Sequence, residues 1–141
     1  MIEKRWDVEP EFTRDLAYGE QAEGMAKDAM RALASGGAEV KSKTRPDDKF
    51  YVETAHKPRG CSDYVPSGIN TTGSAYWWYS IGEPQGSVFV VVATDVLKAA
   101  ARVSPACSTD RGDNPTKGRL VEFKTILDAA ERTIARRSRE C

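Results

Sequence analysis

The sequence predicts a single domain of mixed α/β class, and three observations lead to this prediction. Helical periodicity marks both ends of the chain, at residues 11–37 and 118–141. Short strand-forming runs with turn residues between them fill the middle. The 141 residues, 40% of them apolar, are enough for one buried core. We expect one domain over residues 1–141, with its core at about 11–103 and a C-terminal loop and helix at 104–141.

The first element is a helix over residues 11–37. Gly36 and Gly37 supply a C-terminal stop for it. Its apolar residues recur at helical spacing and form one stripe, made of Phe12, Leu16, Gly19, Ala26, Met30 and Leu33.

Two short strands are expected next, "AEVKSKT" (38–44) and "KFYVETA" (49–55). A polar turn at residues 45–48 joins them, so the two strands should pair as a hairpin. The segment "SGINTTGSAYWWYSIG" (67–82) is divided near Ala75 into a short helix and a strand.

The run "GSVFVVVATDVLKAAARV" (86–103) predicts a central strand, buried on both faces, followed by a helix. Thr94 or Asp95 is able to cap that helix. The stretch at 102–119 is rich in turn residues and predicts a surface loop. The last helix has its apolar side chains at helical spacing, at Leu120, Phe123, Ile126, Leu127, Ala130 and Ile134.

Composition limits the class of protein. Twenty-one basic residues balance twenty-one acidic ones, so a polyanion partner would need a local basic patch. The three cysteines are widely spaced and predict neither a disulfide framework nor a zinc site. No stretch reaches the roughly 20 apolar residues of a membrane span, and the N-terminus has no apolar signal region. We expect a soluble cytoplasmic protein with no membrane partner.

Two groups of charged residues need an explanation beyond folding. Glu23 projects into the middle of the apolar stripe of the first helix, where an unpaired carboxylate is costly to bury. In the expected hairpin, Glu39, Lys41 and Glu53 share one face. Carboxylates held together repel unless a cation lies between them, and Mg²⁺ prefers oxygen ligands of this kind. Without such a ligand, the same residues form an ordinary solvated face.

This grouping resembles the PD-(D/E)XK nuclease superfamily, and more closely its Holliday-junction-resolvase-like and phage-encoded members. The resemblance covers roughly residues 15–95, through the helix pattern Gly19, Glu23, Leu33 and Gly36 and the acidic strand positions with a lysine. It implies a restriction-endonuclease-like αβββαβ core, here with additional C-terminal helices. It also implies one or two Mg²⁺ or Mn²⁺ ions and hydrolysis of DNA phosphodiester bonds.

By this resemblance Glu23, Glu39 and Glu53 would be the metal ligands, and Lys41 would complete the catalytic set. The family pattern has a lysine two positions after the second strand acid, where this chain has Ala55. Lys41 would then act from the neighbouring strand. The expected partner is DNA, including branched DNA, and a homodimer is expected by analogy with resolvases. The alternative is an inactive nuclease-fold protein that binds nucleic acid or a host protein.

Overall fold

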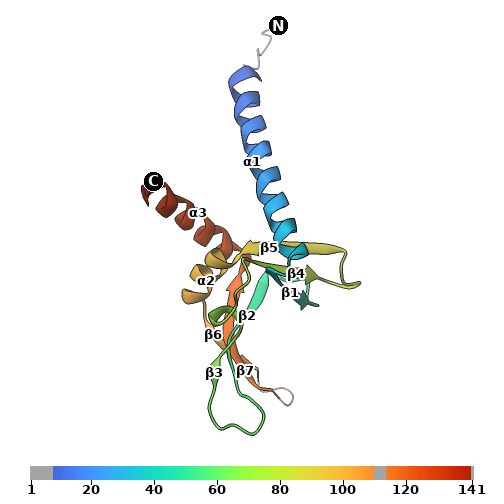
Figure 1. The fold of residues 1–141 in the computed structure, drawn as a ribbon, viewed down its shortest axis with the longest axis vertical. Coiled ribbons are helices and arrows are strands. Elements are labelled where there is room, and N and C mark those ends of the chain that lie inside the picture. Colours follow the sequence, from blue (N-terminus) through green and yellow to red (C-terminus); the bar gives the residue numbers. More distant parts are fainter. Residues whose placement is uncertain (1–7, 110–113, 141) are drawn as a thin grey trace.

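A computed structural model describes residues 8–109 and 114–140. Figure 1 shows a mixed α/β fold. The elements are, in chain order, α1 (Val8–Ala34), β1 (Ala38–Lys43), β2 (Lys49–His56), β3 (Val65–Pro66), the 3₁₀ helix η1 (Gly68–Asn70), β4 (Tyr76–Ile81), β5 (Val88–Ala93), α2 (Thr94–Arg102), β6 (Ala106–Thr109), β7 (Thr116–Glu122) and α3 (Phe123–Glu140). The predicted class is therefore confirmed, and so is the division of residues 67–82 near Ala75.

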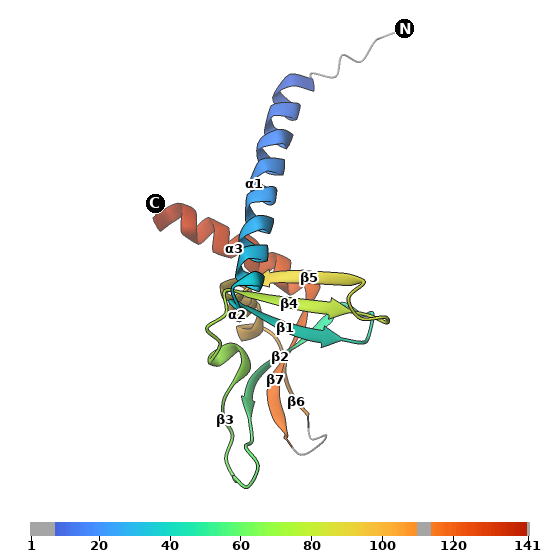
Figure 2. The same ribbon diagram turned by 45° about the vertical axis from the view of Figure 1, so that its right-hand side comes forward.

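The strands form two sheets. The first has the order β1-β4-β5, in which β1 and β4 run parallel and β5 is antiparallel to β4. The second is antiparallel, with the order β3-β2-β7-β6. Figure 2 shows the second sheet extending away from the first, with α1 projecting on the other side.

The predicted hairpin of β1 with β2 is wrong. The two strands are consecutive in the chain, but they belong to different sheets. In β1, Glu39 pairs with Trp77 of β4, and in β2, Glu53 pairs with Gly118 of β7. The turn at 45–48 therefore connects the two sheets. Each of the two strands forms its backbone hydrogen bonds with a strand that is distant in the sequence.

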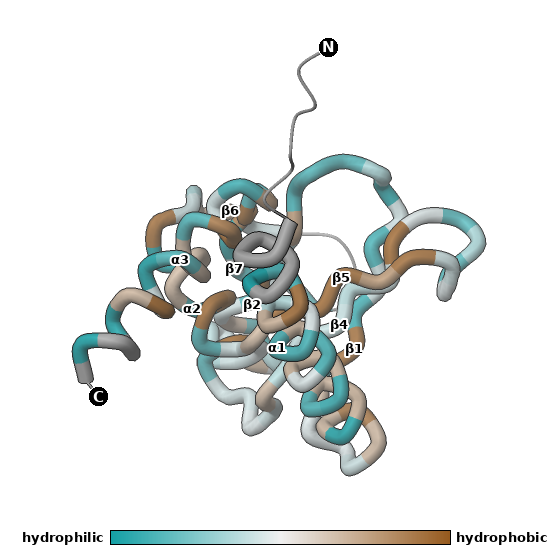
Figure 3. Tube along the Cα trace, turned by 90° about the horizontal axis from the view of Figure 1, so that it is seen from above, coloured by the Kyte–Doolittle hydropathy of each residue, from teal (hydrophilic) through white to brown (hydrophobic). Residues whose placement is uncertain are grey.

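Two further predictions are corrected. The Val/Phe run forms β5, but β5 is an edge strand with Val88, Phe89 and Val91 exposed, so it is not buried on both faces. Figure 3 shows the hydrophobic colouring of this strand. The following helix has no side-chain cap: Thr94 Oγ1 donates to the carbonyl of Ser74, and Asp95 accepts from the next amide, that of Val96.

The turn-rich stretch is also more regular than predicted. It contains β6 and the start of β7, and β7 places Leu120 in a strand, because α3 begins only at Phe123. The core thus extends beyond residue 103. Its buried residues come from both sheets and from η1, α2 and α3, namely Phe50, Val52, Ile69, Trp77, Tyr79, Val92, Leu97, Ala100, Ala101, Val121, Ile126 and Ala129. In the described residues, no helix combines the length and apolar character needed to cross a membrane.

Gly118 permits a close approach between β2 and β7. A Cβ atom at this position would lie 2.5 Å from the Val52 carbonyl oxygen and 2.7 Å from Cζ of Tyr51. We expect Gly118→Ala to lower the free energy of unfolding by about 1–3 kcal/mol, the usual cost of overpacking. Urea denaturation would measure the change. Gly73→Ala is the matched control, since no atom lies within 4 Å of the position that a methyl group would take there, and an unchanged Gly118→Ala protein would contradict the prediction.

Candidate functional site at the junction of the two sheets

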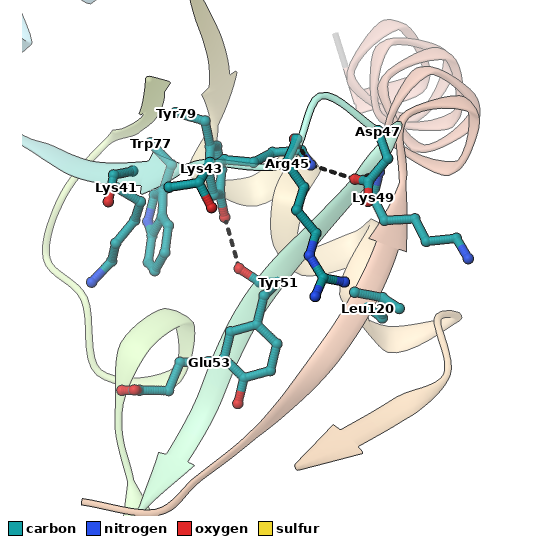
Figure 4. Close-up of a pocket in the computed structure, with 12 residues that line it drawn as sticks. Lys41, Lys43, Arg45, Asp47, Lys49, Tyr51, Glu53, Trp77, Tyr79 and Leu120 are labelled. Atoms are coloured by element: carbon teal, nitrogen blue, oxygen red, sulfur yellow. Dashed lines mark hydrogen bonds and ion pairs between the residues drawn. The ribbon is translucent and has the colours of Figure 1, made fainter. Parts of the chain in front are cut away.

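A cavity of about 600 Å³ opens where β1, the turn after it and β2 meet. We call it the junction cleft. Figure 4 shows its walls: Lys41 and Lys43 come from β1, Arg45 and Asp47 from the turn, and Tyr51 and Glu53 from β2. The complete lining is Lys41, Ser42, Lys43, Thr44, Arg45, Asp47, Lys49, Tyr51, Glu53, Trp77, Tyr79 and Leu120. Four of these side chains are cationic and two are acidic, which gives a neutral chain a local basic site.

Lys41 is held in position from two sides. Its Nζ lies 2.8 Å from Oε1 of Glu39 and 5.6 Å from the centre of the Trp77 ring. The parallel pairing of β1 with β4 causes this arrangement, because it puts Glu39 directly beside Trp77 and Lys41 beside Tyr79. About two-fifths of each charged side chain remains exposed, so the ammonium group can also reach a ligand.

Lys43 has a structural role in the turn. Its Nζ donates to the carbonyl of Arg45 at 2.6 Å and to the carboxylate of Asp47, and it lies over the Phe50 ring. The bond from Lys43, followed by that from the Lys49 amide, lowers the pKa of Asp47 below its ordinary value. The turn is thus closed by an internal ion pair, which leaves Arg45 and Lys49 at the rim of the cleft.

Glu53 enters the cleft from the opposite wall. Its Oε2 accepts a hydrogen bond of 2.7 Å from the hydroxyl of Ser67, which is buried. Gly68 follows with φ of +55°, and a Cβ atom there would lie 2.3 Å from the Glu53 carbonyl oxygen. Ser67 and Gly68 therefore position Glu53, a role that sequence analysis missed. The adjacent Ser-Gly pair at the start of η1 was the available signal, since a hydroxyl beside a glycine is typical of a tight turn.

One hydrogen bond joins the two sheets at the back of the cleft. The hydroxyl of Tyr79 donates to the carbonyl of Tyr51 at 3.3 Å. Burial, and to a lesser degree the negative charge of Glu39, raises the pKa of Tyr79 well above its ordinary value. Tyr79 is therefore a neutral donor at physiological pH, and it links β4, the neighbour of β1, to β2, which carries Glu53.

The structure brings some of the predicted site residues together and leaves one apart. Lys41 and Glu53 both line the junction cleft, and Glu39 contacts Lys41. Glu23 belongs to α1, which projects away from the sheets (Figure 1), and it does not line the cleft. It borders a separate shallow depression lined by α1 residues alone, Asp15, Leu16, Gly19, Glu20 and Glu23.

Ala55 does not line the cleft, and a bulge explains its position. The pairing of β2 with β7 shifts between Glu53 and Ala55. A bulge inserts an extra residue, so side chains beyond it no longer continue the alternation before it. The position at which the nuclease pattern has its lysine is therefore outside the cleft in this chain.

The carboxylates at the cleft limit the kind of metal that it could hold. Over residues 8–109 and 114–140, no group of three or more His, Cys, Asp or Glu side chains is arranged to hold a metal ion. Asp47 and Glu53 are the acidic side chains that line the cleft, and Glu39 contacts Lys41 beside it. Mg²⁺ commonly takes only one or two carboxylates in proteins and completes its shell with water and substrate phosphate.

Comparison of the chain with protein-family models, with curated proteins and with solved structures found no match.

Proposed function

We propose that the protein is a metal-dependent nuclease that binds the phosphate backbone of DNA in the junction cleft and hydrolyses it there. The observation that carries this proposal is the meeting of Lys41 and Glu53 in one cavity, with Glu39 bonded to Lys41 and further cations at the rim. Acidic oxygens for a metal and positive charges for a phosphate are the groups that phosphodiester hydrolysis requires.

Each group has a role in this proposal. Arg45 and Lys49 at the rim bind backbone phosphates on either side of the reacting one. Glu39 and Glu53 would hold Mg²⁺ or Mn²⁺, which when bound polarises the phosphoryl group as a Lewis acid. The Lys41 ammonium stabilises the negative charge that develops on the phosphoryl oxygens. Glu23 has no part at this cleft.

The spacing of Glu39 and Lys41 supports the resemblance to the PD-(D/E)XK superfamily in a new way. The family pattern has an acid and a lysine two positions apart, and Glu39 and Lys41 have this spacing on one face of β1. In this proposal, Glu39 and Lys41 supply the acid and the lysine of the family pattern from one strand, and Glu53 adds a second acid from β2. The residue at position 55 then has no role in catalysis. A restriction-endonuclease-like core remains part of this proposal.

A second candidate function is binding of nucleic acid without cleavage. It is favoured because, among the described residues, no group of three or more His, Cys, Asp or Glu side chains could hold a metal ion. Glu39 is also already neutralised by Lys41 at 2.8 Å. In this case the cationic rim would bind phosphate, and Glu53 would only support η1 through Ser67.

A cleavage and binding assay separates the two functions. Purified protein is incubated with linear, single-stranded and branched DNA, with and without Mg²⁺ or Mn²⁺. We expect cleavage only with metal, and we expect Glu53→Gln to lose cleavage while it still binds DNA, because the amide keeps a similar shape without the charge. Binding of every DNA form without cleavage in either metal would reject the nuclease and favour the second function.

The DNA-binding part of this assay, repeated over a series of salt concentrations, tests where the DNA binds. Removal of one phosphate contact lowers the dependence of log affinity on log salt concentration by about one unit. We expect this change for Arg45→Ala and for Lys49→Ala. Arg102→Ala is the control, because Arg102 is exposed on α2 and lines a different cavity. Equal slopes for all three variants and wild type would place the DNA elsewhere, and absence of binding would reject both functions.

A further inference from the structure

Most of helix α1 has no partner within the described part of the chain. Between residues 14 and 34 only Ala29 is buried and only Ala32 is half-buried. The remainder projects away from the sheets (Figures 1 and 2). A helix in a globular protein is stabilised mainly by the packing of its apolar face, and an isolated one is marginal in water. The exposed length of α1 therefore needs a surface to pack against.

The exposed side of α1 carries a regular apolar stripe. At 100° per residue, this stripe lies roughly a quarter turn away from the face that contacts the sheets through Ala29. The side chains of Leu16, Met30 and Leu33 are 52%, 63% and 41% exposed. Spacings of three and four residues recur along the stripe, which is the pattern of two helices packed side by side. The stripe consists of Leu16, Gly19, Glu23, Ala26, Met30 and Leu33.

We propose that this stripe binds the same stripe of a second copy, with the two α1 helices antiparallel around a two-fold axis between Gly24 and Met25. This register places each large side chain against a smaller one or at an open end of the contact. Met30 meets Gly19 of the second copy, and Glu23 meets Ala26. Leu16 and Leu33 close the two ends. A two-fold contact of this kind uses one self-complementary patch on both copies.

Charge selects the antiparallel direction. In a parallel pair, Glu23 would face Glu23 of the second copy inside the contact, and like charges there repel. In the antiparallel register, Glu20 lies near Lys27 of the second copy, and the two-fold axis repeats this pair along the same edge of the stripe. Neither residue belongs to the ion pairs found within the described chain, so both are available for this contact. The dimer contact thus tolerates Glu23, because the residue opposite it in the second copy is the small Ala26 and solvent is close.

Sedimentation over a concentration series tests the pairing. We expect wild type to pass from monomer to dimer, and we expect Ala26→Glu to stay monomeric, because it sets an acid against Glu23. Gln21→Glu is the control, since position 21 lies on the far side of the helix, and it should dimerise like wild type. Circular dichroism confirms that both variants keep α1. A wild type that is monomeric throughout, or an Ala26→Glu dimer, would overturn the proposal.

Two further variants test the register and direction. Lys27→Glu should weaken the dimer about tenfold, and adding Glu20→Lys should restore it, because the pair is reversed. For direction, the native Cys61, Cys107 and Cys141 are replaced by serine. Leu16→Cys protein should then form a disulfide with Leu33→Cys protein, and neither variant should crosslink alone. Crosslinking of Leu16→Cys with itself, or no rescue by Glu20→Lys, would overturn the antiparallel register.

Discussion

Replacing Lys41 by alanine is expected to slow metal-dependent DNA cleavage by roughly a hundredfold to a thousandfold, the usual effect of removing one group that stabilises a transition state. The ammonium is positioned by Glu39 at 2.8 Å and by the face of Trp77. Single-turnover cleavage under saturating DNA would measure the change in the chemical step. Lys41→Arg should restore little, because a guanidinium is larger and spreads its charge.

The fold should tolerate this change. Partly exposed ion pairs contribute about 0–1 kcal/mol to stability, so the melting temperature of Lys41→Ala should stay near that of wild type. The double variant Lys41→Ala, Ala55→Lys should remain inactive, because the bulge after Glu53 leaves position 55 outside the cleft. Cleavage at the wild-type rate by Lys41→Ala would remove this residue from the mechanism.

Trp77→Ala is expected to give the largest loss of stability, about 3–5 kcal/mol, as is usual for truncation of a buried aromatic residue. Trp77 is 1% exposed and its ring lies 6.3 Å from that of Tyr79. Its indole nitrogen has no hydrogen-bond partner among the described residues, so the loss comes from packing and the cavity left behind. Urea denaturation followed by circular dichroism would measure it.

Trp78 provides the matched control for this prediction. It is the next residue in β4 and has the same size, but its side chain points to the other face of the sheet and is half-buried, against Phe89. We expect Trp78→Ala to cost less than half as much as Trp77→Ala, because it removes less buried apolar area. If both variants lost the same free energy of unfolding, the stability of the core would not depend on the inner face of β4.

Several features of this protein follow from the sequence alone. The periodicity of residues 11–37 predicted α1, and the structure places it at Val8–Ala34, so the helix both begins and ends earlier than predicted. The small residues before Ala75 and the aromatic residues after it separated η1 from β4. These elements were predictable because helices, turns and the ends of strands depend on residues that are a few positions apart in the sequence.

Part of the candidate site was also predictable. The alternation of charge in β1 and β2 drew attention to Glu39, Lys41 and Glu53, and Lys41 and Glu53 do line one cleft. The supporting residues Ser67 and Gly68 were missed, because their contact with Glu53 joins segments 14 and 15 positions apart. Glu23 was grouped with these residues by resemblance, and its position on the projecting helix keeps it apart.

Only the tertiary structure decided which strands pair. A strand with alternating side chains fits several partners equally well, and the choice depends on long-range packing that local patterns do not contain. Thus β1 pairs with β4 rather than β2, β5 is an edge strand rather than a central one, and β7 arises from a stretch rich in turn residues. The junction cleft exists because of that choice, since Lys41 and Glu53 line it from two different sheets and not from one hairpin.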